Sequence, residues 1–221
     1  MNKKLLIIAG LSTVIAAATL PAQAAPSFDF NDGTLQGWTP ATSPFFGGNL
    51  LLSNTGGNPG GYIYVTDNDP TTGGMWVKAP ISGDFSSYAG IQWDDFAFNN
   101  GAFRLGTSQV IIQGNNGTSL TSAFTQTPLQ TWTTHSLSFD NPTQWTISGS
   151  GTLQNVLANV SGLFINLDAS FASTSGGVGV RESGLDNVKL IPRKSSIPEP
   201  SSLLGLLAFG YVATTTILKK K

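Results

Sequence analysis

The chain has 221 residues and no cysteine, so a hydrophobic core has to hold the fold without disulfides. Its formal net charge is −1, but the segment 25–192 carries four basic and eleven acidic residues, a net charge of −7. This balance argues against nucleic acid or an anionic membrane surface as a partner of that segment. Cations and neutral glycans stay open as partners.

The first 24 residues predict a signal peptide. Lys3-Lys4 forms a basic start, the stretch 5–20 is apolar, and Ala22 and Ala24 give the small-x-small pattern that places cleavage before Ala25. A retained membrane anchor is the alternative, because the apolar stretch is slightly long. Cleavage would leave the middle of the chain outside the cytoplasm.

The segment 25–192 predicts one β-rich domain. Short β-branched and aromatic runs alternate with turns rich in Gly, Asn and Asp, and helix signals are nearly missing. The predicted strands are 28–30, 61–65, 75–79, 91–98, 103–105, 110–113, 132–139, 163–167 and 185–190. A hairpin is expected between 103–105 and 110–113, and a short helix at 153–159. Many strands without βα alternation predict an all-β fold, an antiparallel two-sheet sandwich.

Several stretches of this domain resemble a known family. They read FDFNDGTLQGW at 28–38, GGYIYVTDND at 60–69, SGDFSSYAGIQWDDFAF at 82–98 and GLDNVKL at 184–190. This order is similar to a laminin B (domain IV) module and, more loosely, to a carbohydrate-binding jelly-roll sandwich. The resemblance implies a two-sheet jelly roll with adjacent first and last strands, and no enzymatic activity.

The resemblance also implies a calcium site, because in jelly-roll modules a calcium ion often ties the first strand to the last. The matching oxygen ligands here would be Asp29 or Asp32 together with Asp186. The alternative is that Asp32 belongs to a turn and that Asp186 only ends a strand.

Residues for catalysis are sparse, so no enzyme is predicted. His135 is the only histidine, and a structural or surface role is favoured for it. Asp94 and Asp95 are neighbours on a predicted strand and therefore point to opposite faces. Glu182 is the only glutamate in the domain. A glycoside hydrolase would need two carboxyl groups from different strands, and this stays the weakest hypothesis.

The five tryptophans raise the question of glycan binding, because exposed rings can stack on sugars. All five lie in or beside predicted strands, where packing in the core is the default. Trp145 is the candidate for an exposed, sugar-binding ring, because polar residues flank it. The glycine-rich loop 113–118 is consistent with a binding rim or with an ordinary hairpin.

The end of the chain predicts a membrane segment. Pro198, Glu199 and Pro200 keep the chain extended after a linker over 193–202. The uncharged stretch 201–218 would form a helix of about 27 Å, near the lower limit for crossing a bilayer, with its transmembrane part at 203–218. The basic tail, Lys219, Lys220 and Lys221, would stay in the cytoplasm. A buried helix is the alternative, but the stretch lacks a polar face.

This C-terminal order of Pro-Glu-Pro, apolar helix and basic cluster resembles a PEP-CTERM sorting signal. The resemblance implies processing by a membrane enzyme, exosortase, and association with the cell surface or exopolysaccharide. We therefore expect an exported, non-catalytic surface or matrix protein with the inner membrane and an exosortase as partners. A carbohydrate-binding module with a polysaccharide partner is the alternative function.

Overall fold

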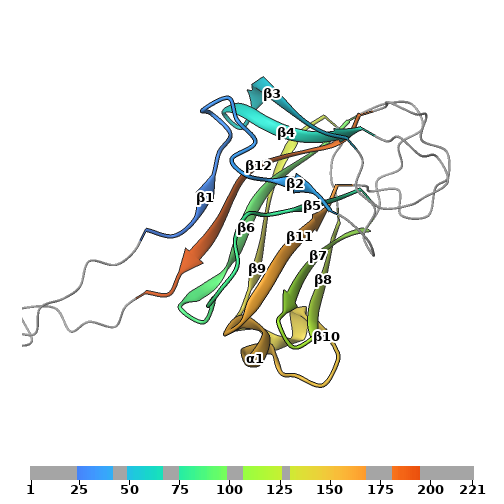
Figure 1. Cartoon of the computed structure of the whole chain (residues 1–221). Helices are drawn as coiled ribbons and strands as arrows, with labels where there is room; N and C mark the ends of the chain where they lie inside the picture. Colours follow the sequence, from blue (N-terminus) through green and yellow to red (C-terminus); the bar gives the residue numbers. More distant parts are fainter. Residues whose placement is uncertain are drawn as a thin grey trace, which may run out of the picture.

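The computed structural model describes residues 24–41, 49–66, 75–98, 107–125, 130–167 and 181–194. These residues form two six-stranded antiparallel sheets that pack face to face (Figure 1). The prediction of an all-β, two-sheet jelly-roll sandwich is confirmed at this level. The two sheets are called the first and the second sheet below.

The first sheet has the order β3-β4-β12-β6-β9, and β1 pairs with β12 beside this path. Its strands are β1 (Ser27–Phe28), β3 (Asn49–Gly57), β4 (Gly60–Thr66), β6 (Tyr88–Ala97), β9 (Trp132–Ser138) and β12 (Arg181–Pro192). The second sheet has the order β10-β8-β7-β11-β5-β2. Its strands are β2 (Thr39–Pro40), β5 (Trp76–Lys78), β7 (Thr107–Gly114), β8 (Ser119–Thr125), β10 (Thr146–Ser148) and β11 (Val160–Asn166).

The core lies between the two sheets and follows from the period-two alternation of the strands. Ile91 and Trp93 of β6 face inward, whereas Gln92 and Asp94 lie on the opposite face. The second sheet contributes its alternate apolar residues to the same core. The inward-facing residues of its two central strands are Val110, Ile112, Leu163 and Ile165.

Two helical turns close the lower end of the sandwich in Figure 1, a 3-10 turn η1 (Pro142–Gln144) and α1 (Leu153–Leu157). Thr152 caps α1 by accepting a hydrogen bond from the Asn155 amide, and the Asn155 side chain accepts one from the Thr152 amide. Leu153 and Leu157 are buried on its inner side. The predicted helix at 153–159 is therefore present but two residues shorter.

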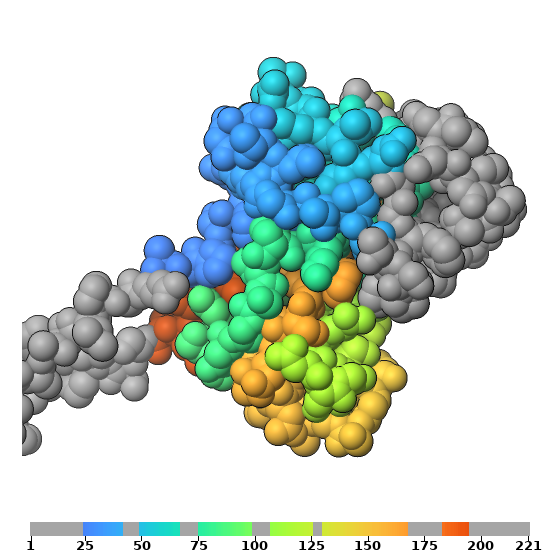
Figure 2. Space-filling model, viewed as in Figure 1, coloured from blue at the N-terminus to red at the C-terminus, as the bar shows by residue number. Residues whose placement is uncertain are grey.

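The first and last strands lie side by side, as the family resemblance implied. Ser27 pairs with Lys189 and Phe28 with Val188. Figure 2 shows the blue N-terminal and red C-terminal residues adjoining at one side of the molecule. The two described ends of the domain therefore emerge together.

Several strand predictions are confirmed, since 61–65 lies within β4 and 132–139 coincides with β9 apart from its last residue. The long strand β3 and the strand β8 were missed. The expected partner of 110–113, the segment 103–105, lies outside the described residues; β7 pairs with β8 and β11 instead. Its turn to β8 is the glycine-rich loop at 115–118.

The predicted sorting elements cannot be compared with the structure in the same way. The signal peptide up to residue 23, the Pro-Glu-Pro motif, the apolar stretch 203–218 and the lysine tail lie outside the described residues. Within the described ranges, none of the helices has the length and apolarity needed to cross a bilayer. These elements therefore stay predictions.

Candidate functional site

One row of side chains crosses the outer face of the second sheet from edge to edge. In antiparallel sheets, directly paired residues point to the same face. The paired positions, from β10 to β2, are Thr146, Thr121, Ile111, Phe164, Lys78 and Thr39. Five spacings of about 4.8 Å make this cross-strand row roughly 24 Å long. Both of its ends lie on edge strands.

The middle of the cross-strand row is apolar. Phe164 and Ile111 form a small buried cluster with Trp76 and Ala41, separate from the main core. Phe164 is only 6% exposed. Gly162 leaves room for its ring, because a Cβ atom at Gly162 would lie 2.7 Å from the Phe164 ring. This cluster gives the outer face an apolar floor.

Polar side chains surround this floor. The Lys78 ammonium lies 5.8 Å from the centroid of the Phe164 ring, and Lys78 is exposed. Gln113 pairs with Gly162 one row below, and Gln109 pairs with Ala123 one row above; both glutamines are half-buried. In the described part of the chain, none of these three side chains has a hydrogen bond or ion pair. Their donors and acceptors are available to a ligand.

The outer face of the first sheet has a different character, because its aromatic rings pack on one another. Tyr62 and Trp132 meet edge to face, with ring centroids 5.4 Å apart. They meet over Gly184, where a Cβ atom would lie 3.0 Å from the Tyr62 ring and 3.2 Å from Trp132. The only polar donor of Trp132, its Nε1–H, binds the carbonyl oxygen of Gly56 at 2.9 Å. The hairpin of β3 and β4 thus holds this cluster.

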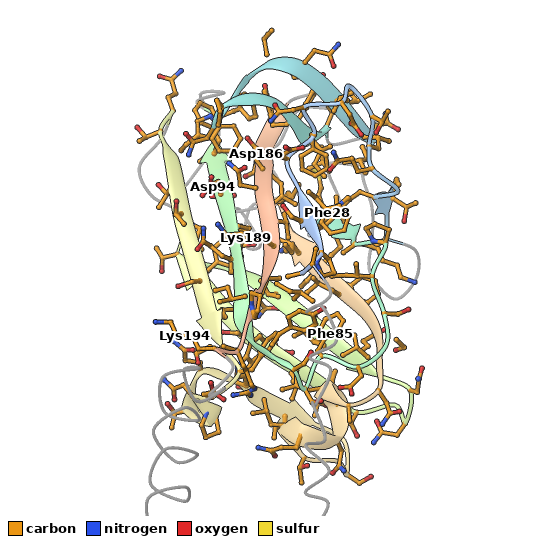
Figure 3. The ribbon with its side chains drawn as sticks, turned by 90° about the vertical axis from the view of Figure 1, so that its left-hand side faces the viewer. Phe28, Phe85, Asp94, Asp186, Lys189 and Lys194 are labelled. Atoms are coloured by element: carbon orange, nitrogen blue, oxygen red, sulfur yellow. The ribbon has the colours of Figure 1, made fainter. Side chains whose placement is uncertain are left out.

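The same hairpin covers a pair of buried carboxylates. Asp94 of β6 and Asp186 of β12 are paired across the sheet and are 4% and 0% exposed. Figure 3 shows them side by side beneath β3 and β4. Asp186 accepts hydrogen bonds from the backbone amides of Asn58 at 2.7 Å and Asn187 at 2.7 Å. Asn58 lies at the hairpin turn.

Asp94 accepts three side-chain hydrogen bonds. The donors are Thr134 Oγ1 at 2.6 Å, Asn187 Nδ2 at 2.8 Å and Asn58 Nδ2 at 3.1 Å. Asn187 Nδ2 also donates to the carbonyl oxygen of Asn58. The two carboxylates therefore have protein donors around them and almost no solvent contact.

Burial raises the pKa of Asp186 to about 6, and the negative charges of Asp94 and Asp29 act in the same direction. The hydrogen bonds from Asn58 and Asn187 oppose this shift. A pair of carboxyl groups is what a glycoside hydrolase needs, but no substrate can reach a pair closed under a hairpin. The described residues therefore give no support to the hydrolase hypothesis.

The predicted calcium ligands are only partly brought together. Asp29 is close enough for its charge to act on Asp186, and its Oδ1 accepts hydrogen bonds from Asn31 and Gln36. Asp32 instead caps a turn by accepting from Thr34 and is exposed. Among the described residues, no three His, Cys, Asp or Glu side chains gather closely enough to hold a metal. A calcium site would need carbonyl oxygens beside Asp29 and Asp186, and it stays a prediction.

The expectation for Trp145 was wrong. Its ring is 6% exposed and belongs to the main core. It packs on Phe139 with ring centroids 5.9 Å apart, and its Nε1–H binds the carbonyl oxygen of Ser138 at 2.9 Å. The neighbouring residues Thr143 and Gln144 face solvent, whereas the Trp145 ring turns inward. The polar neighbours in the sequence did not predict exposure of Trp145. They form a 3-10 turn on the surface, whereas Trp145, the residue that ends this turn, points its ring into the core.

His135 and Asp95 also lie on the inner face, and Asp95 therefore points away from Asp94, as the alternation predicted. The His135 ring stacks on Trp93 with centroids 5.4 Å apart. Burial lowers the pKa of His135, and the charge of Asp94 opposes this only in part. A neutral, stacked ring fits the structural role expected for His135.

The fold resembles solved carbohydrate-binding modules. The module CtCBM11 matches with a TM-score of 0.50 and 18% identity, over 79% of this chain and 99% of that chain. The non-crystalline cellulose specific module CBM28 matches with a TM-score of 0.50 and 15% identity, over 75% and 94%. The fold is that of jelly-roll carbohydrate-binding modules. An exo-beta-agarase also matches with a TM-score of 0.53 and 13% identity, over 76% of this chain but 25% of the enzyme.

At these identities, the likeness concerns the fold alone. No protein-family model matches the sequence, and no curated protein sequence matches it. The resemblance to laminin B modules therefore stays a resemblance in sequence pattern. The jelly-roll fold that it implied is confirmed.

Sequence reasoning missed the cross-strand row. The alternation in 110–113 and 163–167 does show Ile111, Gln113 and Phe164 on faces opposite to the core residues. Without the strand order, however, nothing indicates that Lys78 pairs with Phe164. The row depends on register between distant segments, which a single sequence does not encode locally.

Proposed function

We propose that this domain binds a neutral polysaccharide across the outer face of its second sheet and has no catalytic activity. The observation that carries the proposal is the cross-strand row, whose apolar floor is surrounded by polar side chains without protein partners. Sugar rings are amphipathic and need both surfaces, one for their C–H faces and one for their hydroxyl groups.

Charge favours a neutral polymer. The segment 25–192 has a net charge of −7, which repels an anionic chain at long range. Lys78 donates hydrogen bonds from three N–H groups, and Gln109 and Gln113 both donate and accept. A row of roughly 24 Å that is open at both edge strands suits the interior of a chain rather than its end.

The fold supports the same ligand class by analogy. The two modules with this fold are named as carbohydrate-binding, and one of them as specific for non-crystalline cellulose. Because fold does not determine function, the proposal stands on the row itself and uses the likeness only as background.

Affinity electrophoresis of the full chain in a non-ionic detergent tests this proposal. The gels would contain mixed-linked β-1,3-1,4-glucan, xylan or agarose. Gln113→Ala should weaken retardation about tenfold in apparent affinity, because it removes hydrogen bonds to the ligand. Gln92→Ala is the matched control, since Gln92 is also half-buried on an outer face, but on the first sheet. Equal retardation of both variants, or none of the wild type in any gel, would contradict the proposal.

We also propose that the domain acts outside the cytoplasm, on the basis of the predicted signal peptide and of Pro198-Glu199-Pro200 with its apolar and basic continuation. Processing near this motif would release the domain to the cell surface or matrix. Mass spectrometry of protein from the native host should find mature C-termini near residues 198–201. Surface-exposed protein that ends at Lys221 would rule out the sorting signal.

A further inference from the structure

A groove, called the terminal groove below, lies at the end of the sandwich where the two described chain ends emerge. It has a volume of about 590 Å³ and lies between the loop before β6 and the end of β12. Its lining includes the aromatic residues Tyr88 and Phe85 and the polar residues Asp84 and Arg193. This volume is in the range of small-molecule sites, about 300–1,000 Å³.

The aromatic wall of this terminal groove is held in place. The Phe85 amide donates to the carbonyl oxygen of Leu157 at 2.6 Å, and the Tyr88 amide donates to that of Phe85 at 3.0 Å. The Phe85 ring is buried and meets the half-buried Tyr88 ring edge to face, with centroids 6.1 Å apart and planes at 87°. The backbone of this wall is therefore held in place, and the Tyr88 ring already packs on Phe85, before any ligand arrives.

The charges of the terminal groove exclude an anion. The Asp84 carboxylate accepts a hydrogen bond from the Ser86 amide at 2.8 Å, and the side-chain and backbone hydrogen bonds of Ser86 lower the pKa of Asp84. Arg193 is the only cationic residue of this lining. Its guanidinium pairs with Asp140, and its Nε–H donates to the carbonyl oxygen of Ser86 at 3.0 Å. The groove thus offers an ionised acceptor but no unpaired cation.

We propose that the terminal groove is a second binding site for a neutral sugar unit. Tyr88 would pack against the C–H face of the ring, and Asp84 would accept hydrogen bonds from its hydroxyl groups. Serine hydroxyls at the rim, Ser82 and Ser87, can donate or accept. A hydroxyl-rich, uncharged ligand matches this lining better than an anion or a purely apolar molecule.

The terminal groove is separate from the cross-strand row, since the two share no residue. Figure 3 shows Phe85 toward the opposite end of the molecule from Asp94 and Asp186. Two sites for one polymer on one domain would raise its overall affinity through effective concentration. The inference assumes the ligand class of the proposed function but not its site.

Isothermal titration of the full chain with the β-1,3-1,4-mixed-linked tetrasaccharide, xylan oligosaccharides and agarose oligosaccharides tests the second site. We expect two sites per chain for at least one of these probes. Asp84→Asn and Tyr88→Ala should each weaken one site about tenfold. Tyr88→Phe should retain it, because the ring remains. Asp32→Asn is the matched control, since Asp32 caps a similar exposed turn.

The outcomes separate the two sites. A site that Tyr88→Ala weakens, with no site that Gln113→Ala weakens, would support the inference and overturn the proposed site on the second sheet. One site that is insensitive to Asp84→Asn and Tyr88→Ala, in variants with the melting temperature of the wild type, would overturn the inference. No binding of any probe would overturn both.

Discussion

The outer faces of the two sheets follow from the same alternation, yet their polar groups differ. We call the first sheet's outer face closed because its polar groups have protein partners, and the second sheet's outer face open because the side chains of Lys78, Gln109 and Gln113 have no hydrogen bond or ion pair among the described residues. On the first sheet, the hairpin of β3 and β4 covers Asp94 and Asp186, and Trp132 donates its only N–H to Gly56. On the second sheet, Lys78, Gln109 and Gln113 surround an apolar floor and have no partner within the described part of the chain.

This difference shows what makes a sheet face available for binding. Aromatic and acidic residues are more numerous on the closed face, but their hydrogen-bonding groups already have partners. A ligand gains little from groups that it would first have to free, because each lost hydrogen bond has to be replaced. Available donors above a rigid apolar floor are therefore a better indicator of a site than aromatic content.

The largest expected effect is on the closed face. Asp94→Ala removes the acceptor of three hydrogen bonds, from Thr134, Asn58 and Asn187. Leaving these donors unpaired at a buried position should lower the free energy of unfolding by about 3 kcal/mol. Urea denaturation measures this change. Affinity for polysaccharide should stay at the wild-type value, and a loss of affinity without a loss of stability would mean that the closed face binds the ligand.

If Asp29 and Asp186 share a calcium ion, the ion stabilises the closed face further. At a calcium concentration of 100 times Kd, the ion would stabilise the protein by about 2.7 kcal/mol. A chelator should then lower the melting temperature, and Asp186→Ala should abolish this response. Asp32→Asn should leave the response intact, because Asp32 bonds to Thr34 and not to this pair. Melting curves that are identical with and without chelator would eliminate the site.

The raised pKa of Asp186 predicts a dependence of stability on pH when calcium is absent. Its pKa is about 6 in the folded state, against an ordinary value of 3.8 for an aspartate. Between these values the folded state binds more protons, so the free energy of unfolding should fall as pH rises from about 4 to about 6. Solvent screening reduces the expected loss to about 2 kcal/mol. Asp94 and Asp29 are the charged groups that act on Asp186.

Denaturation at several pH values in the presence of chelator would measure this loss, with Asp186→Asn as the comparison. The variant should lack the decrease between pH 4 and pH 6. Asp29 acts in the opposite direction, because hydrogen bonds from Asn31 and Gln36 lower its pKa, but its contribution is lost only below about pH 4. If the free energy of unfolding instead rises between pH 4 and pH 6, the pKa of Asp186 is not raised in the folded protein.

Much of the fold was predictable, because strands arise from residue patterns within short segments of the sequence. Alternation in 132–139 and the continuous apolar run in 61–65 are enough to identify β9 and β4. The strand β3 was missed, since its second half, SNTGG, consists mostly of the Gly, Asn and Ser residues that are typical of turns. It forms because it pairs with β4 over Asn49 to Ser53.

The sites were less predictable because they depend on register and burial. Asp186 was selected as a calcium ligand, which stays a prediction. Its partner across the sheet is Asp94, and nothing in the sequence indicated that these two residues pair. Trp145 was selected for its polar neighbours, whereas a 3-10 turn directs its ring into the core. Both outcomes depend on tertiary contacts that one sequence does not specify position by position.

The smallest expected effect on stability belongs to Lys78, and it tests the open face most directly. Beyond sheet pairing, its side chain has no hydrogen bond or ion pair with the described residues, and its ammonium lies 5.8 Å from the centroid of the Phe164 ring. At an exposed position such a contact contributes about 0.5 kcal/mol. Lys78→Met keeps an unbranched stem over the apolar floor and removes the charge and its three donors.

We therefore expect the free energy of unfolding of Lys78→Met to change by less than about 0.5 kcal/mol, while affinity for the bound polysaccharide falls about tenfold. Denaturation and affinity electrophoresis on the same preparation give both numbers. A loss of stability as large as that of Asp94→Ala would mean that Lys78 is part of a closed structure like the first sheet's outer face. Unchanged affinity would remove Lys78 from the site. Only a stable variant with weakened binding matches a face whose polar groups are free for a ligand.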